Sequence, residues 1–219
     1  MCAGRRTLLL LATGTVLVIA AVAIRDARLP EPAPLTVQAR GYAKLRAILT
    51  HVAASDFGRR ERGARLTAIL ERLLETDRIR FSATLGGPRA QMYSRPFRRP
   101  LLYVRILRPR EDTWLHQLPH QLAEAVYHEA VHFAQGGLGR ASFEEECDAF
   151  LAGLDAEAIL LGIPPPDQPT IDGMSVAAFV RHAYPHAPRN PRYRPIGKDR
   201  TWLLRRARAA DPAVGTPPD

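Results

Sequence analysis

The stretch PHQLAEAVYHEAVHFAQ, residues 119–135, decides how this chain is organised. Its proline suits the first turn of a helix and the Gly-Gly pair that follows suits the end, so we expect one helix across the whole stretch. At about 100° per residue, His128 and His132 lie about 40° apart on one side of that helix and one turn apart. Two imidazoles at this spacing can reach the same metal ion.

A second helix is expected after a short connection. The segment SFEEECDAF, residues 142–150, opens an apolar run with helical spacing that ends at Gly162, and its serine suits the N-cap position. Only residues 136–141 join the two helices, so the second helix should return antiparallel to the first. Its glutamates then face the last turn of the helix that carries the histidines.

The three glutamates of this segment are expected to have different roles. Glu145 lies three residues after the serine and fits a capping box, whereas Glu146 would point towards solvent or complement the helix dipole. A catalytic zinc site needs three protein ligands and leaves the fourth position to water. Glu144 is then free to be the third ligand, and Asp148, four residues later on the same face, would orient a ligand histidine. The cysteine between them falls on the apolar stripe and is a weaker alternative.

The simplest alternative is an amphipathic helix whose two histidines are incidental. An H-E-x-x-H match arises by chance in roughly one sequence in a hundred of this length and composition, so the motif alone is only suggestive. The carboxylates predicted on the facing helix change that balance. Together the two helices favour a metal site.

The segments HEAVH and EEECDAF together resemble the gluzincin arrangement of zinc metallopeptidases, in which H-E-x-x-H is followed by Glu-x-x-x-Asp or Asn on the next helix. The resemblance covers roughly residues 99–160. The strand LLYVRIL, residues 101–107, also resembles the edge strand that binds extended substrate in that clan. A metzincin site would need Gly and His where this chain has Gln135 and Leu138.

The resemblance implies hydrolysis of a peptide bond in a peptide or protein substrate. His128, His132 and Glu144 would hold one zinc ion per chain, which lowers the pKa of its bound water towards about 7. Glu129, beside a ligand, would take the proton of that water as the catalytic base and pass it to the leaving amine.

The anion that forms on the scissile carbonyl also needs a hydrogen-bond donor. Three side chains that follow the site in the sequence have suitable chemistry: His182, Tyr184 and His186. The alternative is that they form the exposed end of a surface helix before the next proline.

The N-terminal residues predict a membrane segment. Residues 7–24 carry no charge, and a helix of this length spans about 27 Å, enough to cross a bilayer. Arg5 and Arg6 precede it and predict that the rest of the chain lies outside the cytoplasm, in the periplasm of a Gram-negative cell. We favour a retained membrane anchor that comprises residues 1–24. Residues 21–23 also match a signal-peptidase site, so secretion after cleavage is the alternative.

One α+β domain is expected beyond this segment. Residues 25–35 form a proline-rich linker, residues 36–205 the domain, and residues 206–219 a disordered tail. Two segments with helical spacing open the domain, and a shorter helix over residues 174–184 follows the metal helices. Short strands are predicted at residues 78–85, 90–97 and 100–107. We therefore expect a small zincin-like domain with N-terminal helices, a short, mostly antiparallel sheet, and two antiparallel helices that carry the metal site.

Composition argues against a nucleic-acid partner. The formal net charge is +9, but the arginines that produce it are scattered along the chain and form no stripe. Two other function classes stay open: a zinc-binding envelope scaffold without proteolysis, and an anchored protein without metal. Metal analysis distinguishes the protein without metal from the peptidase. The activity of a Glu129→Gln variant distinguishes the zinc-binding scaffold from the peptidase.

Overall fold

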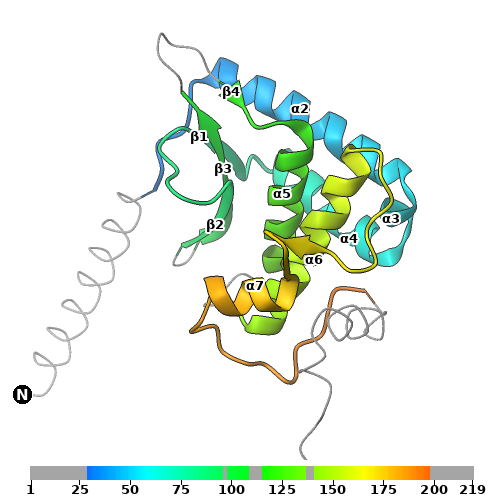
Figure 1. Cartoon of the computed structure of the whole chain (residues 1–219). Helices are drawn as coiled ribbons and strands as arrows, with labels where there is room; N and C mark the ends of the chain where they lie inside the picture. Colours follow the sequence, from blue (N-terminus) through cyan, green and yellow to red (C-terminus); the bar gives the residue numbers. More distant parts are fainter. Residues whose placement is uncertain (1–28, 96–97, 109–114, 137–140, 198–219) are drawn as a thin grey trace, which may run out of the picture.

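The structure is a computed structural model, and it describes residues 29–95, 98–108, 115–136 and 141–197 (Figure 1). Three helices come first: α2 (Leu35–Ala54), α3 (Asp56–Arg59) and α4 (Glu61–Glu75). Four strands follow: β1 (Ile79–Ser82), β2 (Ala90–Arg95), β3 (Arg98–Leu107) and β4 (Leu115–His116). The later elements are α5 (Pro119–Ala134), α6 (Phe143–Leu160), β5 (Thr170–Ile171), β6 (Met174–Ser175) and α7 (Val176–Ala183).

This order of elements is a mixed α/β architecture, compatible with the predicted α+β class. The three predicted strands coincide with β1, β2 and β3, and the predicted histidine helix coincides with α5. The predicted membrane segment (residues 7–24) and the predicted tail (residues 206–219) lie outside the described residues. Within the described ranges, no helix has both the length and the apolar composition needed to cross a bilayer.

Strand β3 is the centre of the main sheet. It pairs in parallel with β1 and antiparallel with both β2 and β4, so Leu102 lies opposite Ile79 on one side and Met92 on the other. Two of these three pairings are antiparallel, as predicted for the sheet. The comparison of residues 101–107 with a substrate-binding edge strand is wrong, because β3 is bonded on both sides. The edge strand next to α5 is β2.

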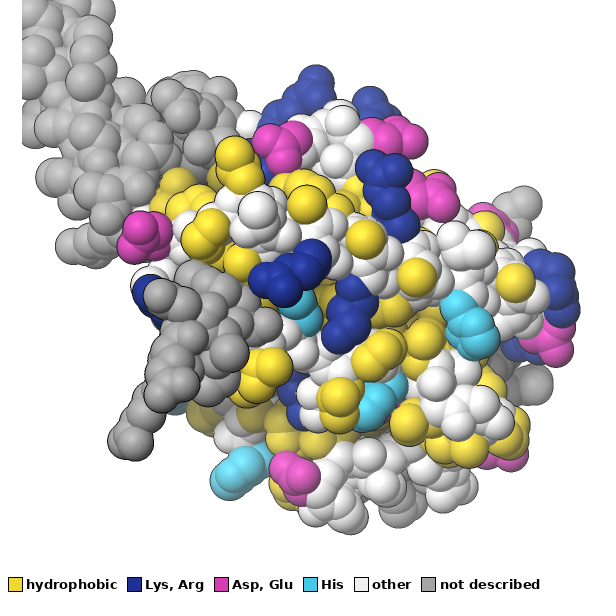
Figure 2. Space-filling model, turned by 90° about the horizontal axis from the view of Figure 1, so that it is seen from above, with side chains coloured by type: hydrophobic (Ala, Val, Ile, Leu, Met, Phe, Trp, Pro, Cys, Tyr) yellow, Lys and Arg dark blue, Asp and Glu magenta, His cyan; other side chains and the backbone are white. Residues whose placement is uncertain are grey.

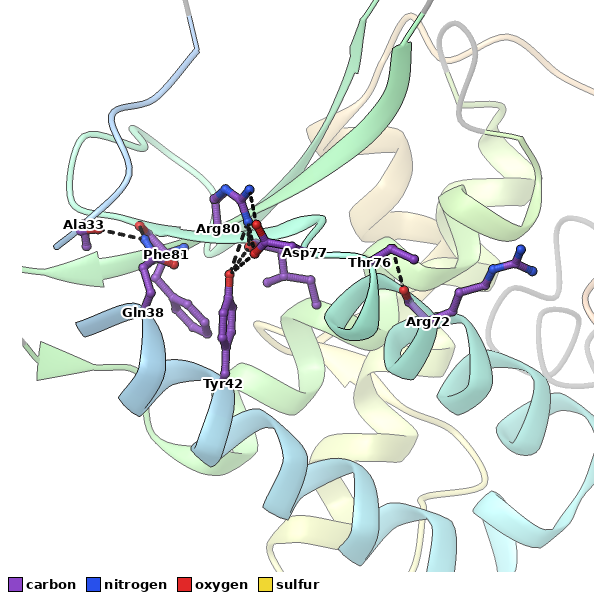
Figure 3. Close-up of polar contacts among 9 residues, drawn as sticks. Ala33, Gln38, Tyr42, Arg72, Thr76, Asp77, Arg80 and Phe81 are labelled. Carbon is purple, nitrogen blue, oxygen red and sulfur yellow. Dashed lines mark hydrogen bonds and ion pairs between the residues drawn. The ribbon is translucent and has the colours of Figure 1, made fainter. Parts of the chain in front are cut away.

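Helix α2 covers the free edge of β1 (Figure 3). The side-chain amide of Gln38 donates to Phe81 O (2.7 Å) and accepts from Phe81 N (2.9 Å), so it occupies the edge that a further strand would need. Gly41 allows this close approach, because a Cβ atom there would lie 2.4 Å from the ring of Phe81. The hydroxyl of Tyr42 lies 2.9 Å from Asp77 Oδ1 and secures the turn before β1.

The main hydrophobic core lies where α2, α4, α5, α6 and the sheet meet. Apolar side chains from each of these elements are fully removed from solvent, and their burial supplies the dominant favourable term in folding. Those with no exposed surface include Leu45, Leu66, Leu70, Ile79, Leu102, Val126 and Ala149.

Helices α5 and α6 pack closely and antiparallel. Gly153, late in α6, lies against Glu124, early in α5, and a Cβ atom at Gly153 would lie 2.6 Å from the carbonyl oxygen of Glu124. At the other end, His132 of α5 contacts Glu145 of α6. Ser142 caps α6 by accepting a hydrogen bond from Glu145 N (3.2 Å), as the sequence predicts. This pairing brings the histidines to the first turn of α6.

The last part of the described chain packs around the start of α6. The β5–β6 hairpin and α7 bury a second, smaller apolar cluster against one side of α6. Residues 187–197, here called the C-terminal strap, then run back along α5 and α6. Phe143 N donates to Pro188 O (2.9 Å), Gln135 Nε2 donates to Arg194 O (3.0 Å), and Ile196 inserts into the main core.

Candidate metal centre

Two histidines and one glutamate converge between α5 and α6. The Nε2 atoms of His128 and His132 lie 3.2 Å apart. Glu146 places Oε2 3.6 Å from His128 Nε2 and Oε1 3.8 Å from His132 Nε2. One ligand atom from each of the three residues lies within 4.8 Å of the others, so the group could hold a metal ion.

The chemistry of these donors fits a divalent transition metal. Two imidazole nitrogens and one carboxylate oxygen form a set that zinc accepts in catalytic sites. Glu146 is only 8% exposed, and its Oε2 atom has no hydrogen-bond partner among the described residues. An unpartnered buried carboxylate oxygen is costly, and a bound cation would remove that cost.

Glu145 holds one of the histidines in place. Its Oε1 atom lies 2.8 Å from His132 Nδ1, the ring nitrogen that faces away from the cluster. A hydrogen bond from Nδ1–H to this carboxylate fixes the tautomer that leaves Nε2 free to bind metal. The orienting role that the sequence suggested for Asp148 is therefore filled by Glu145.

The prediction that Glu144 is the third ligand is corrected by the structure. Glu144 Oε2 accepts from Asn190 N (2.7 Å) and Oε1 pairs with Arg189 Nε (2.9 Å), so this carboxylate faces the C-terminal strap. Glu146, two residues on, lies on the other side of α6 and faces α5. A helix rotates by about 200° over two residues, which is why only one of the two can reach the histidines.

Asp148 has a structural environment. It is 1% exposed, forms an ion pair with Arg62 of α4, and accepts a hydrogen bond from the hydroxyl of Tyr193 in the C-terminal strap (2.6 Å). Arg62 also donates to the backbone oxygen of Asp148 (2.9 Å). These contacts tie α4, α6 and the C-terminal strap together.

Glu129 lies on α5 beside the ligands, where the sequence predicts the catalytic base. It is 8% exposed, and its Oε2 atom accepts from the backbone N–H of Met92 in the edge strand β2 (2.9 Å). Burial raises the pKa of Glu129 to about 7, with the charge of Glu146 acting in the same direction and His132 opposing it. A carboxyl group with this pKa can both accept and release a proton near neutral pH.

The pKa values of the two histidines are shifted in opposite directions. Burial and the neighbouring His132 lower the pKa of His128 well below its usual range. Burial also acts to lower the pKa of His132, but the hydrogen bond to Glu145 and the carboxylates of Glu129 and Glu146 outweigh it and raise that pKa. His128 is therefore held as the neutral imidazole that a metal requires, while His132 is held close to compensating negative charge.

An aromatic wall stands on the α7 side of the cluster. The ring of Phe150 lies 4.5 Å from the ring of His128, 5.2 Å from Phe179 and 6.3 Å from Tyr184 (centroid distances). These rings come from α6 and from the segment that includes α7. They place apolar surface next to the ligand whose pKa is most strongly lowered by burial.

Of the three predicted oxyanion donors, Tyr184 lies beside the cluster. Burial and the carboxylates of Glu146 and Glu129 raise its pKa to about 12, so its hydroxyl keeps its proton at neutral pH. The Tyr184 side chain is still 40% exposed. His182 and His186 are exposed at the surface, as the alternative interpretation of the sequence expects.

Comparisons with protein-family models, with curated proteins and with solved structures find no match for this chain. The gluzincin resemblance therefore rests on the H-E-x-x-H residues, because Glu144 and Asp148 of the second motif lie away from the cluster. The convergence of two α5 histidines with an α6 carboxylate is the feature from which a function can be argued.

The roles of Glu145 and Glu146 were missed at the sequence level, although the sequence carries a signal for them. Ala149, Gly153 and Ala156 recur at helical spacing on the buried side of α6, where Gly153 lies against Glu124 of α5. One turn earlier, the same side is occupied by Glu145 and Glu146. The small residues, rather than the capping pattern, indicate which glutamates face the histidines.

Proposed function

We propose that this protein is a zinc-dependent metallopeptidase, tethered to a membrane by residues 7–24, with its domain outside the cytoplasm. The observation that carries the proposal is the convergence of His128, His132 and Glu146 beside the buried carboxyl group of Glu129. A metal-binding set and a neighbouring acid–base group are the two parts that metal-assisted hydrolysis requires.

Each residue of the site has a defined task in this proposal. Zinc, when bound by His128, His132 and Glu146, supplies Lewis acidity that lowers the pKa of a water molecule and polarises the scissile carbonyl. Glu129 takes a proton from the attacking water and passes it to the nitrogen of the leaving amine. Tyr184 keeps its proton at neutral pH and donates a hydrogen bond to the carbonyl oxygen as negative charge develops there.

A single substitution separates the role of Glu129 from that of the ligands. Glu129→Gln keeps the size of the side chain but removes the base, so zinc content should be unchanged while peptide hydrolysis falls by about a hundredfold or more. Hydrolysis is measured on the full chain with unfolded casein and a fluorogenic peptide library. His128→Ala is the matched control, because it should lose zinc and activity together. Equal cleavage by wild type and Glu129→Gln, with equal zinc content, would contradict the mechanism.

A zinc-binding scaffold without proteolysis is the second candidate. It is favoured by one contact: the Glu129 carboxylate already accepts a hydrogen bond from Met92 N, and less than a tenth of the residue is exposed. In that case a fully zinc-loaded protein cleaves none of the peptides, and Glu129→Gln changes neither zinc content nor activity.

A further inference from the structure

An exposed leucine-rich face lies at the end of the domain opposite the metal centre. Leu35 is 86% exposed, Leu107 and Leu115 are each 53% exposed, and Leu118 is 55% exposed. Leu107 and Leu115 are cross-strand partners in the β3–β4 pair. The ammonium group of Lys44 in α2 donates to Gln117 O (2.6 Å) and fixes α2 beside this pair. Exposed leucines that a strand pair and a helix place at one end of a domain are typical of an interaction surface.

The side chains that α2 contributes beside these leucines are basic. Helix α2 contains no aspartate or glutamate, and its exposed side carries Arg40 and Arg46, with His51 in the last turn. Figure 2 looks onto this end of the molecule and shows hydrophobic and basic side chains over its middle, with Asp and Glu towards the margins. We call the four leucines with Arg40 and Arg46 the α2–β4 face. Its composition suits an apolar surface that bears negative charge.

The position of the chain brings such a surface within reach. Leu29 packs against the sheet, and Glu31 N donates to Thr84 Oγ1 (2.8 Å), so residues 25–28 separate the apolar segment, residues 7–24, from the folded domain. Four residues span at most about 14 Å, even when fully extended. A bilayer that holds residues 7–24 would therefore lie within about 14 Å of Leu29, and at that effective concentration a weak surface affinity of the domain suffices for docking.

We propose that the α2–β4 face rests on an anionic lipid bilayer, with the leucines at the boundary between headgroups and acyl chains and the arginines at lipid phosphates. Each basic side chain near such a surface contributes attraction, and arginine pairs with phosphate through two parallel hydrogen bonds. This inference rests on the membrane tether of the proposed function and adds an orientation to it.

The orientation determines which polypeptides the site can reach. Helix α5 begins next to the α2–β4 face and carries His132 in its last turn, close to α7 at the other end of the domain (Figure 1). His132 lies thirteen positions after Pro119, which corresponds to about 20 Å along the helix. With the α2–β4 face on the bilayer, the metal centre stands about 20 Å or more from the lipid. In this orientation, the site can reach polypeptide segments that are exposed in the aqueous phase. It cannot reach polypeptide segments inside the membrane.

Depth measurements on the full chain test the proposal. In a Cys2→Ser background, a fluorophore is attached at Leu115→Cys or, as a control, at Arg192→Cys, an exposed position in the C-terminal strap. The protein is reconstituted into vesicles of phosphatidylcholine with or without phosphatidylglycerol, and fluorescence is quenched by lipids brominated on their acyl chains. Circular dichroism and zinc content confirm that each variant is folded.

We expect quenching at position 115 to exceed that at position 192 by about twofold or more in anionic vesicles. The double charge reversal Arg40→Glu with Arg46→Glu should remove this difference. Equal quenching at both positions overturns the proposal. A change in the fluorescence of the label at position 115 that occurs only at a higher ratio of protein to vesicle also overturns it, because a second copy of the chain then covers the face. Failure of the protein to float with vesicles would instead contradict the tether in the proposed function.

Discussion

Two buried carboxylates on α6, only two residues apart, have opposite surroundings. Asp148 pairs with the guanidinium group of Arg62 and accepts from the hydroxyl of Tyr193. Glu146 lies between two imidazoles, 3.6 and 3.8 Å away, and has no arginine or lysine partner among the described residues. Asp148 has its compensating charge within the chain. Glu146 faces two imidazoles and is arranged to accept a bound cation.

The surroundings of Glu146 and Asp148 predict different effects when each carboxylate is removed. Burial raises the pKa of Glu146, with His132 acting against the shift. A buried charge without a full partner disfavours the folded state, whereas breaking a complete buried pair is strongly destabilising. The comparison therefore predicts that Asp148 matters for stability and that Glu146 matters for metal binding.

Removing the paired carboxylate should have the largest effect on stability. Asp148→Asn leaves the guanidinium group of Arg62 without its carboxylate, so the free energy of unfolding should fall by about 3 kcal/mol. Urea unfolding in the presence of EDTA measures this. Glu146→Gln is the matched control and should leave the stability of the metal-free protein unchanged or raise it. Equal destabilisation by both variants would contradict the distinction between the two carboxylates.

The pH dependence of the metal-free protein tests the buried acid beside the ligands. The pKa of Glu129 is raised to about 7 in the folded state, so its proton favours folding at low pH, and this contribution is lost as the pH rises through 7. Glu129→Gln cannot titrate, so relative to wild type it should gain roughly 2 kcal/mol of stability between about pH 5 and pH 8. The measurement is thermal unfolding in EDTA at several pH values. A constant difference between the two proteins would show that Glu129 is not perturbed.

A smaller effect is expected for the residue that orients His132. Glu145→Ala removes the acceptor of the Nδ1 hydrogen bond, so zinc affinity should fall by about tenfold, or 1.4 kcal/mol. Competition with a chromophoric chelator measures the change. The control is Glu144→Ala, which breaks contacts with Arg189 and Asn190 but should leave zinc affinity unchanged. A larger loss for Glu144→Ala would return the ligand role to that residue.

The elements of the fold could be predicted because their signals are local. Pro119 starts α5 and Ser142 caps α6, and the strand segments are bounded by turn residues. These signals depend on neighbours in the sequence and survive in any tertiary context. They predict helices α5 and α6, their antiparallel direction and the position of the two histidines.

The third candidate ligand could not be predicted from the capping pattern, because it depends on how α6 is rotated about its axis. That rotation is set by Gly153 packing on α5 and by the C-terminal strap, whose Asn190 engages Glu144. The ion pair between Arg62 and Asp148 joins residues 86 positions apart, and no local pattern indicates it. Contacts of this kind appear only when the whole domain is folded.

The zinc-to-protein ratio of three proteins tests the central claim most directly. Wild type, Glu146→Gln and Glu144→Gln are loaded with zinc, dialysed and analysed by mass spectrometry, with circular dichroism to show that each is folded. We predict about one zinc per chain in wild type and Glu144→Gln, and no stoichiometric zinc in Glu146→Gln. A folded wild type without zinc, or a Glu146→Gln variant that keeps zinc while Glu144→Gln loses it, would contradict the assignment of His128, His132 and Glu146 as the metal centre.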